Sequence, residues 1–143
     1  MERKKHGFFG LPLLQHVAGY SDRWVVVRGF TYASPDGCVV RVGSGWETDG
    51  ASVPRALWAI FPPMSGPYME AAVLHDALYR AQPVSRKRAD ELFLEAMKAL
   101  GVPAWKRWSI YGAVRAFGWR AWRENEKLTP QQRPQVEVYR CGK

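Results

Sequence analysis

Cysteine and long apolar segments are both scarce in this sequence, and each scarcity excludes a class of protein. Only two of the 143 residues are cysteines, Cys38 and Cys141, which is too few for a small fold held together by disulfides. The two thiols can pair with each other, but a reducing compartment is the simpler interpretation. No apolar run reaches the roughly 20 residues that a transmembrane helix needs. The sequence therefore predicts a domain without a membrane span.

Acidic residues are also few. The chain has 13 Asp and Glu against 21 Lys and Arg, and its formal net charge is +8. Such an excess points to an anionic partner, which can be an anionic lipid surface, nucleic acid or an acidic component of a virus particle. Composition does not choose among these partners. The apolar content of 47% is ordinary for a folded protein and excludes a wholly disordered chain.

The length predicts one folded domain with its own core. We expect an extended N-terminal arm over residues 1–20, a single domain over residues 21–125 and a polar tail over residues 126–143. The arm is rich in basic residues at its start. The tail has one short segment, residues 136–139, with the composition of a strand.

The first half of the predicted domain has the composition of a β-hairpin. Residues 24–27 and residues 38–42 are rich in β-branched and aromatic side chains, and Pro35-Asp36-Gly37 between them has the chemistry of a turn. A stretch rich in glycine and proline follows and reaches residue 66. No long helix is expected in that stretch.

Three helices are predicted in the second half. The first begins near Pro67 and runs through Tyr68 to about Arg80. The second begins after Ser85, whose hydroxyl is a suitable N-cap, and ends at Gly101. The third begins near Pro103 and continues through residue 125. Strands followed by helices predict an α+β fold, with a small antiparallel sheet or hairpin and a three-helix core in which the first two helices are antiparallel.

The first helix raises the main functional question, because it is apolar almost all the way round yet contains His75 and Asp76. Such a helix is normally buried, and its polar groups then need partners. Neighbouring helix positions point roughly 100° apart, so His75 and Asp76 face different partners. Asp90 lies on the inner side of the next helix, where it can pair with His75. A carboxylate on one imidazole nitrogen leaves the other free to act as a base.

Two interpretations of this pair stay open. Taken alone, a buried His–Asp pair is more often a structural contact than a catalytic one. Asp76 beside the pair, together with Asp49 in an upstream glycine-rich loop, has the composition of a site for a hard cation such as calcium. The alternative for Asp49 is an ordinary turn residue.

Several motifs resemble a family of unknown function that phages and prophages encode. These motifs are TDGASVPRALW (48–58), GPYMEAAVLHDALYR (66–80), RADELFLEAM (88–97) and YGAVRAFGW (111–119). The resemblance covers most of the chain, from about Trp24 to Trp122. It implies a phage or prophage origin and names no activity.

A second resemblance covers the two helices that carry the acids. His75, Asp76 and Tyr79, followed by Asp90 on the next helix, are similar to the core of phospholipases of the A2 type, in particular the form without disulfides in parvovirus capsid proteins. The resemblance implies that His75 takes a proton from water and that Asp90 orients it. It also implies that Asp76 binds calcium and that Tyr79 supports Asp90.

The third helix interleaves aromatic and basic residues. The spacing of its tryptophans favours burial of most of their rings in the core, with the long basic side chains at the edge. A nucleic-acid or membrane surface is the functional alternative. The residues of this segment are Trp105, Trp108, Trp119 and Trp122, and its candidate anion-binding residues are Arg115, Arg120 and Arg123.

Three hypotheses for the function follow. The leading one is a phage protein with a phospholipase-like site, a metal-assisted hydrolase of lipids or other esters at the cell envelope. The second is a non-enzymatic accessory protein of the phage head or tail, in which His75, Asp76 and Asp90 form a structural network. The third is a nucleic-acid binder that depends on the net positive charge. The expected location is the host cytoplasm or the virus particle.

Overall fold

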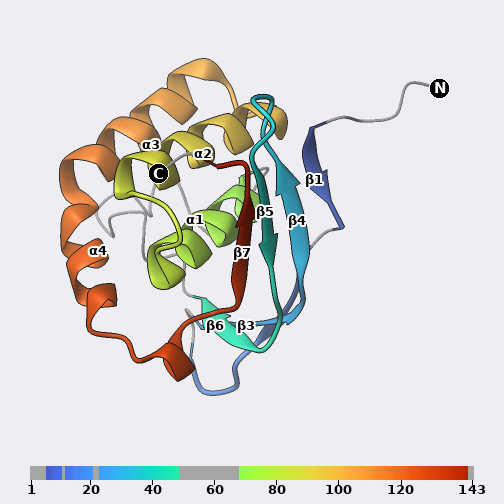
Figure 1. Ribbon diagram of the computed structural model, residues 1–143, viewed down its shortest axis with the longest axis vertical. Coiled ribbons are helices and arrows are strands. Elements are labelled where there is room, and N and C mark those ends of the chain that lie inside the picture. Colours follow the sequence, from blue (N-terminus) through green and yellow to red (C-terminus); the bar gives the residue numbers. More distant parts are fainter. Residues whose placement is uncertain (1–5, 11, 21–22, 49–67, 142–143) are drawn as a thin grey trace.

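Figure 1 shows a computed structural model of the chain, which describes residues 6–10, 12–20, 23–48 and 68–141. Strands come first and helices follow, so the predicted α+β class is confirmed. Within the described residues the strands form two antiparallel sheets, and the last strand of the larger sheet follows the helices in sequence. No helix in this part of the chain is both long and apolar enough to cross a membrane.

The larger sheet has four strands in the order β1-β4-β5-β7. Their bounds are Gly7–Phe9, Phe30–Ala33, Val39–Val42 and Val136–Tyr139. The smaller sheet has three strands in the order β2-β3-β6. Their bounds are Leu13–His16, Trp24–Arg28 and Trp46–Thr48.

The predicted hairpin exists, but only the second half of its predicted first arm, residues 23–34, pairs with β5. The partner of β5 is β4, with Phe30 opposite Val42, whereas residues 24–28 belong to the smaller sheet. The chain changes sheets at Gly29, where an added Cβ would collide with the carbonyl oxygen of Val42. The alternation of buried and exposed side chains along β4 determines its register with β5, because Phe30 and Tyr32 are buried on the same face of the strand.

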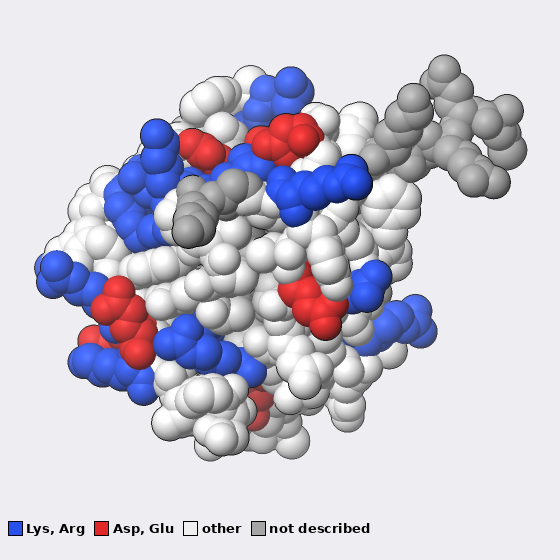
Figure 2. Space-filling view, viewed as in Figure 1, with Lys and Arg blue, Asp and Glu red and all other residues white. Residues whose placement is uncertain are grey.

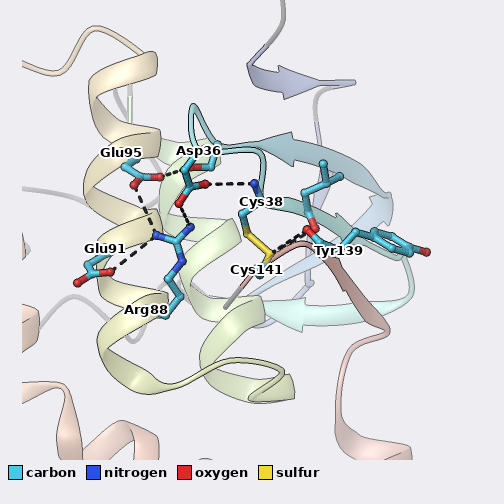
Figure 3. The surroundings of a disulfide bond; sticks show 9 residues. Asp36, Cys38, Arg88, Glu91, Glu95, Tyr139 and Cys141 are labelled. Atoms are coloured by element: carbon cyan, nitrogen blue, oxygen red, sulfur yellow. Dashed lines mark hydrogen bonds and ion pairs between the residues drawn. A yellow bond between two sulfur atoms is a disulfide. The ribbon is translucent and has the colours of Figure 1, made fainter. Parts of the chain in front are cut away.

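The ends of the described chain are built into the sheets. Strands β1 and β2 lie within the predicted arm and pair with β4 and β3, and β7 lies within the predicted tail and pairs with β5. Cys38 and Cys141 form a disulfide across 103 positions of sequence, beside the junction of β5 and β7 (Figure 3). The pairing of the two cysteines, which the sequence left open, is therefore present.

The turn between β4 and β5 is attached to the helical layer (Figure 3). Arg88 donates to a carboxylate oxygen of Asp36 at 2.5 Å, and it also lies within ion-pair distance of Glu91 and Glu95. Ser34, just before the turn, donates to Glu95 at 2.5 Å. These contacts hold the hairpin against the helix that carries Asp90.

Four α-helices are present in the described residues: α1 (Met69–Ala81), α2 (Arg86–Ala99), α3 (Ala104–Phe117) and α4 (Trp119–Glu126). The predicted N-cap of α2 is confirmed, since the Ser85 side chain accepts from the amide of Arg88. The predicted third helix is wrong in one respect, because it is divided at Gly118. A Cβ at Gly118 would collide with the hydroxyl of Tyr79 and the carbonyl of Val114, so this close approach needs glycine.

Helix α1 occupies the centre of the domain. Figure 1 shows it between the larger sheet and the layer formed by α2, α3 and α4. Residues 71–79 are all buried, as the almost uniformly apolar sequence predicts. This burial explains why the polar side chains of α1 are so fully engaged with neighbouring elements.

The predicted burial of the tryptophans is wrong for three of them. Trp105, Trp108 and Trp119 are 67%, 55% and 42% exposed. Helix α3 turns Ile110 and Val114 inward instead. Helical spacing identifies residues that share a face, but it does not say whether that face points to the core or to solvent.

Candidate active site

The structure brings His75 of α1 and Asp90 of α2 together in the core. The Nε2 atom of His75 lies 2.7 Å from Oδ1 of Asp90, and both side chains are fully buried. The two helices are joined by a short turn that ends at the Ser85 cap, which places their inner faces against each other. The contact inferred from helix faces is therefore present.

Tyr79 supports the same carboxylate from the next turn of α1. Its hydroxyl donates to Oδ1 of Asp90 at 2.7 Å, and its ring lies 4.3 Å from the imidazole of His75. Burial raises the pKa of Tyr79, and the negative charge of Asp90 raises it further. The phenol thus stays protonated and keeps donating at any ordinary pH.

Two arginines complete the surroundings of Asp90. Arg115 of α3 donates to Oδ2 at 2.8 Å, and Arg86 of α2 lies 3.5 Å from the same oxygen. Arg86 also donates to the carbonyls of Val114 and Arg115 near the end of α3. Arg115 was expected as an anion-binding residue at the edge of the third helix, and Arg86 was not predicted as a site residue. The i, i+4 spacing of Arg86 and Asp90 was the available signal.

These donors decide the charge of Asp90. Burial by itself raises the pKa of this carboxyl, but the hydrogen bonds from His75, Arg115 and Tyr79 outweigh it. The pKa of Asp90 therefore lies below its ordinary value. The same contact raises the pKa of Arg115. Asp90 is an anion at neutral pH.

An anionic Asp90 determines the tautomer of His75. The carboxylate oxygen only accepts, so Nε2 carries the proton and neutral His75 has its lone pair on Nδ1. Nδ1 is buried and has no hydrogen-bond partner in the part of the chain that the structure describes. The ring stacks on Phe93 at 4.3 Å, which fixes its plane. The arrangement is an oriented imidazole with an unused basic nitrogen.

Asp76 faces a different set of partners, as its neighbouring position on the helix requires. It accepts from the hydroxyl of Thr48 at 2.6 Å, and Nε of Arg80 lies 3.2 Å from both of its oxygens. The contact joins α1 to β6. Asp49, the other predicted metal ligand, lies outside the described residues.

The remaining predicted binding residues lie on α4. The guanidinium groups of Arg120 and Arg123 lie 5.3 and 5.4 Å from the centre of the Trp119 ring. Both side chains are exposed. Tyr79 makes the link between this helix and the buried cluster, because its ring packs edge-on against Trp122 at 5.1 Å.

A family described as "Protein of unknown function (DUF1353)" matches residues 24–114. The chain belongs to this family. The DUF1353 segment contains His75, Tyr79 and Asp90, and Arg115 follows directly after it. The family description assigns no reaction to these residues.

One curated relative of the DUF1353 segment is an uncharacterized protein, y4jT, of the bacterium Sinorhizobium fredii. It is 34% identical over 90 residues, which is 62% of this chain. The chain spans only 27% of that relative's length. No solved structure matches the chain.

Proposed function

We propose that this DUF1353 domain is a hydrolase of carboxylic esters, with lipid esters of a cell envelope as its substrate class, and that it is of phage or prophage origin. The observation that carries the activity is the state of His75. Its Nε2 is held by an ionised, buried Asp90, and its Nδ1 has no partner among the described residues. This is the arrangement of an oriented general base.

The proposed reaction uses one water molecule. Nδ1 of His75 takes a proton from the water as its oxygen bonds to the ester carbonyl carbon. Asp90 stabilises the imidazolium that forms, and the contacts of Tyr79 and Arg115 keep Asp90 in place. The tetrahedral intermediate then breaks its bond to the alkoxide, and His75 returns the proton to that oxygen. The products are a carboxylic acid and an alcohol.

Calcium does not fit the described residues. Arg80 already lies against both oxygens of Asp76, and the described part of the chain holds no group of three or more acids, histidines or cysteines placed to hold a metal ion. No step of the proposed reaction is therefore routed through a metal. Calcium binding by Asp76 and Asp49 stays a prediction, and calorimetric titration of the wild type and Asp76→Asn with calcium tests it.

A second candidate, a non-enzymatic phage accessory protein, is favoured by a different observation. The donors around Asp90 come from three helices: His75 and Tyr79 from α1, Arg86 from α2 and Arg115 from α3. A buried carboxylate with so many partners is explained by a structural role alone, which is to specify how the helices pack. The hydrolase and the structural network make different demands on His75.

The decisive experiment compares two substitutions of His75. The side-chain amide of His75→Gln can still donate to Asp90 but has no basic nitrogen, whereas His75→Ala removes both. Fatty-acid release from mixed anionic liposomes is measured with calcium and with chelator, and folding is followed by circular dichroism. The hydrolase predicts that the wild type releases fatty acid and that folded His75→Gln does not.

The structural alternative predicts a different pattern. The wild type then releases no fatty acid, His75→Gln keeps wild-type stability, and His75→Ala is strongly destabilised. Release by the wild type that His75→Gln retains in full would remove His75 from the reaction. Glu91→Gln is the matched control, since it changes an acid on the solvent side of α2 and leaves His75, Asp90 and Tyr79 in place.

A further inference from the structure

Helix α3 presents an apolar stripe to solvent. Trp105, Trp108, Gly112 and Ala116 follow each other at helical spacing and are all exposed. Phe117 and Trp119 continue this surface at the junction with α4, and Phe117 is 64% exposed. Large aromatic side chains rarely gather on the surface of a protein without a partner to cover them.

The charges around the stripe are mainly positive. Helix α3 has three basic residues and no acidic one, and α4 adds Arg120 and Arg123. The acidic residues of α4 lie in its last turn, where Glu124 pairs with Lys127. Figure 2 shows Lys and Arg side chains along the side of the molecule where Figure 1 places α3 and α4, together with acidic side chains near α4 and uncharged areas between them. An anionic partner is complementary to this surface.

We infer that this α3–α4 surface docks on an anionic lipid bilayer. The α3–α4 surface consists of Trp105, Trp108, Phe117, Trp119, Arg120 and Arg123. Tryptophan rings and arginines favour the headgroup zone of a membrane, and an apolar stripe with basic flanks lets a helix lie in that zone. Anionic lipids attract such basic side chains.

Two other occupants fit the observations less well. A second copy of the chain would bring the same basic residues face to face in a two-fold interface. A nucleic-acid strand would need open ring faces for stacking. The face of Trp119 is already approached by two arginines, and Trp108 meets Tyr111 edge-on at 5.7 Å.

The docking surface is connected to the candidate active site through α3. Arg115 of this helix donates to Asp90, so the helix that would lie on the lipid also positions the carboxylate behind His75. Docking would bring the domain to an ester substrate held in a membrane. That role rests on the proposed function, whereas the binding itself does not require hydrolysis.

Binding is measured by co-sedimentation with vesicles of ether-linked lipids, which contain no carboxylic ester to hydrolyse. One set of vesicles mixes phosphatidylglycerol with phosphatidylcholine, and the other is phosphatidylcholine alone. We expect the wild type to prefer the anionic vesicles. Arg120→Gln/Arg123→Gln should weaken partitioning about 30-fold, because each basic residue near an anionic surface contributes about 1 kcal/mol.

The aromatic residues are tested by Trp105→Ala/Trp108→Ala, which should weaken binding about tenfold or more because the inserted rings lose their apolar contact. The matched control is Leu13→Ala/Val27→Ala, which removes exposed apolar side chains from the smaller sheet. The control should bind like the wild type. Hydrolysis of a water-soluble short-chain ester is measured in parallel for every variant.

The outcomes separate docking from catalysis. Vesicle binding without ester hydrolysis supports docking and overturns the proposed hydrolase. Hydrolysis of the soluble ester without vesicle binding supports the hydrolase and overturns docking. Equal binding to both vesicle types, or unchanged binding by the tryptophan variant, refutes the inference. So does a tryptophan-dependent affinity for single-stranded DNA or a tryptophan-dependent dimer in place of vesicle binding.

Discussion

The substitution Asp90→Asn tests the buried cluster most directly, because it changes the charge of the side chain and almost nothing of its shape. Asn can still accept one bond from His75 or Tyr79 through its amide oxygen. Its amide nitrogen is a donor and would face Arg115 and Arg86, which are donors as well. Two positive charges would then lose their counter-ion.

The size of the effect follows from burial. Removal of one partner from a buried ion pair costs about 3–5 kcal/mol. The arginine side chains here are partly exposed, at 32% and 22%, so water compensates part of the loss. We therefore expect the free energy of unfolding to fall by about 3 kcal/mol, toward the lower end of that range.

Urea denaturation followed by tryptophan fluorescence measures this difference. The midpoint should move to lower urea concentration with an unchanged slope, because the surface exposed on unfolding stays the same. Glu91→Gln is the matched control, since it removes an acid from the solvent side of the same helix, and its midpoint should hardly move. A change of less than about 0.5 kcal/mol for Asp90→Asn would refute the claim that the cluster stabilises the fold.

Three further predictions follow from the same contacts. Because the pKa of Asp90 is lowered in the folded state, its stabilising effect is complete above the unfolded pKa, about 3.9, and is lost as the pH falls through the folded pKa. The difference in melting temperature between the wild type and Asp90→Asn should therefore shrink from pH 7 to pH 3. A difference that stays constant would contradict this prediction. Reduction of the Cys38–Cys141 bond opens a loop of about 100 residues and should lower the free energy of unfolding by about 4–5 kcal/mol in the chain-entropy account. Thermal melts with and without reductant measure this loss, and an unchanged melt would show that the bond does not form. Gly118→Ala places a methyl group against the hydroxyl of Tyr79 and should cost about 1–3 kcal/mol in a urea titration, whereas a neutral result would mean that Tyr79 moves away freely.

Local sequence determined much of the helical half. The Ser85 cap, the buried α1 and the facing positions of His75 and Asp90 all follow from periodicity and capping chemistry, which act over a few residues. Tyr79 belongs to the same group, because it lies one turn after His75. These features were predictable because helix contacts are local in sequence.

Only the tertiary structure decided the other features. The pairing of β7 with β5, the bond between Cys38 and Cys141, and the approach of Arg115 to Asp90 join residues that are distant in sequence. The close approach of Tyr79 to Gly118 also joins elements that are distant in sequence. The direction of the tryptophan face also needed the structure, since helical spacing defines a face but its orientation depends on which neighbouring elements pack against it. The sequence thus determined the helices and the pairing of His75 with Asp90, and long-range packing decided what surrounds that pair.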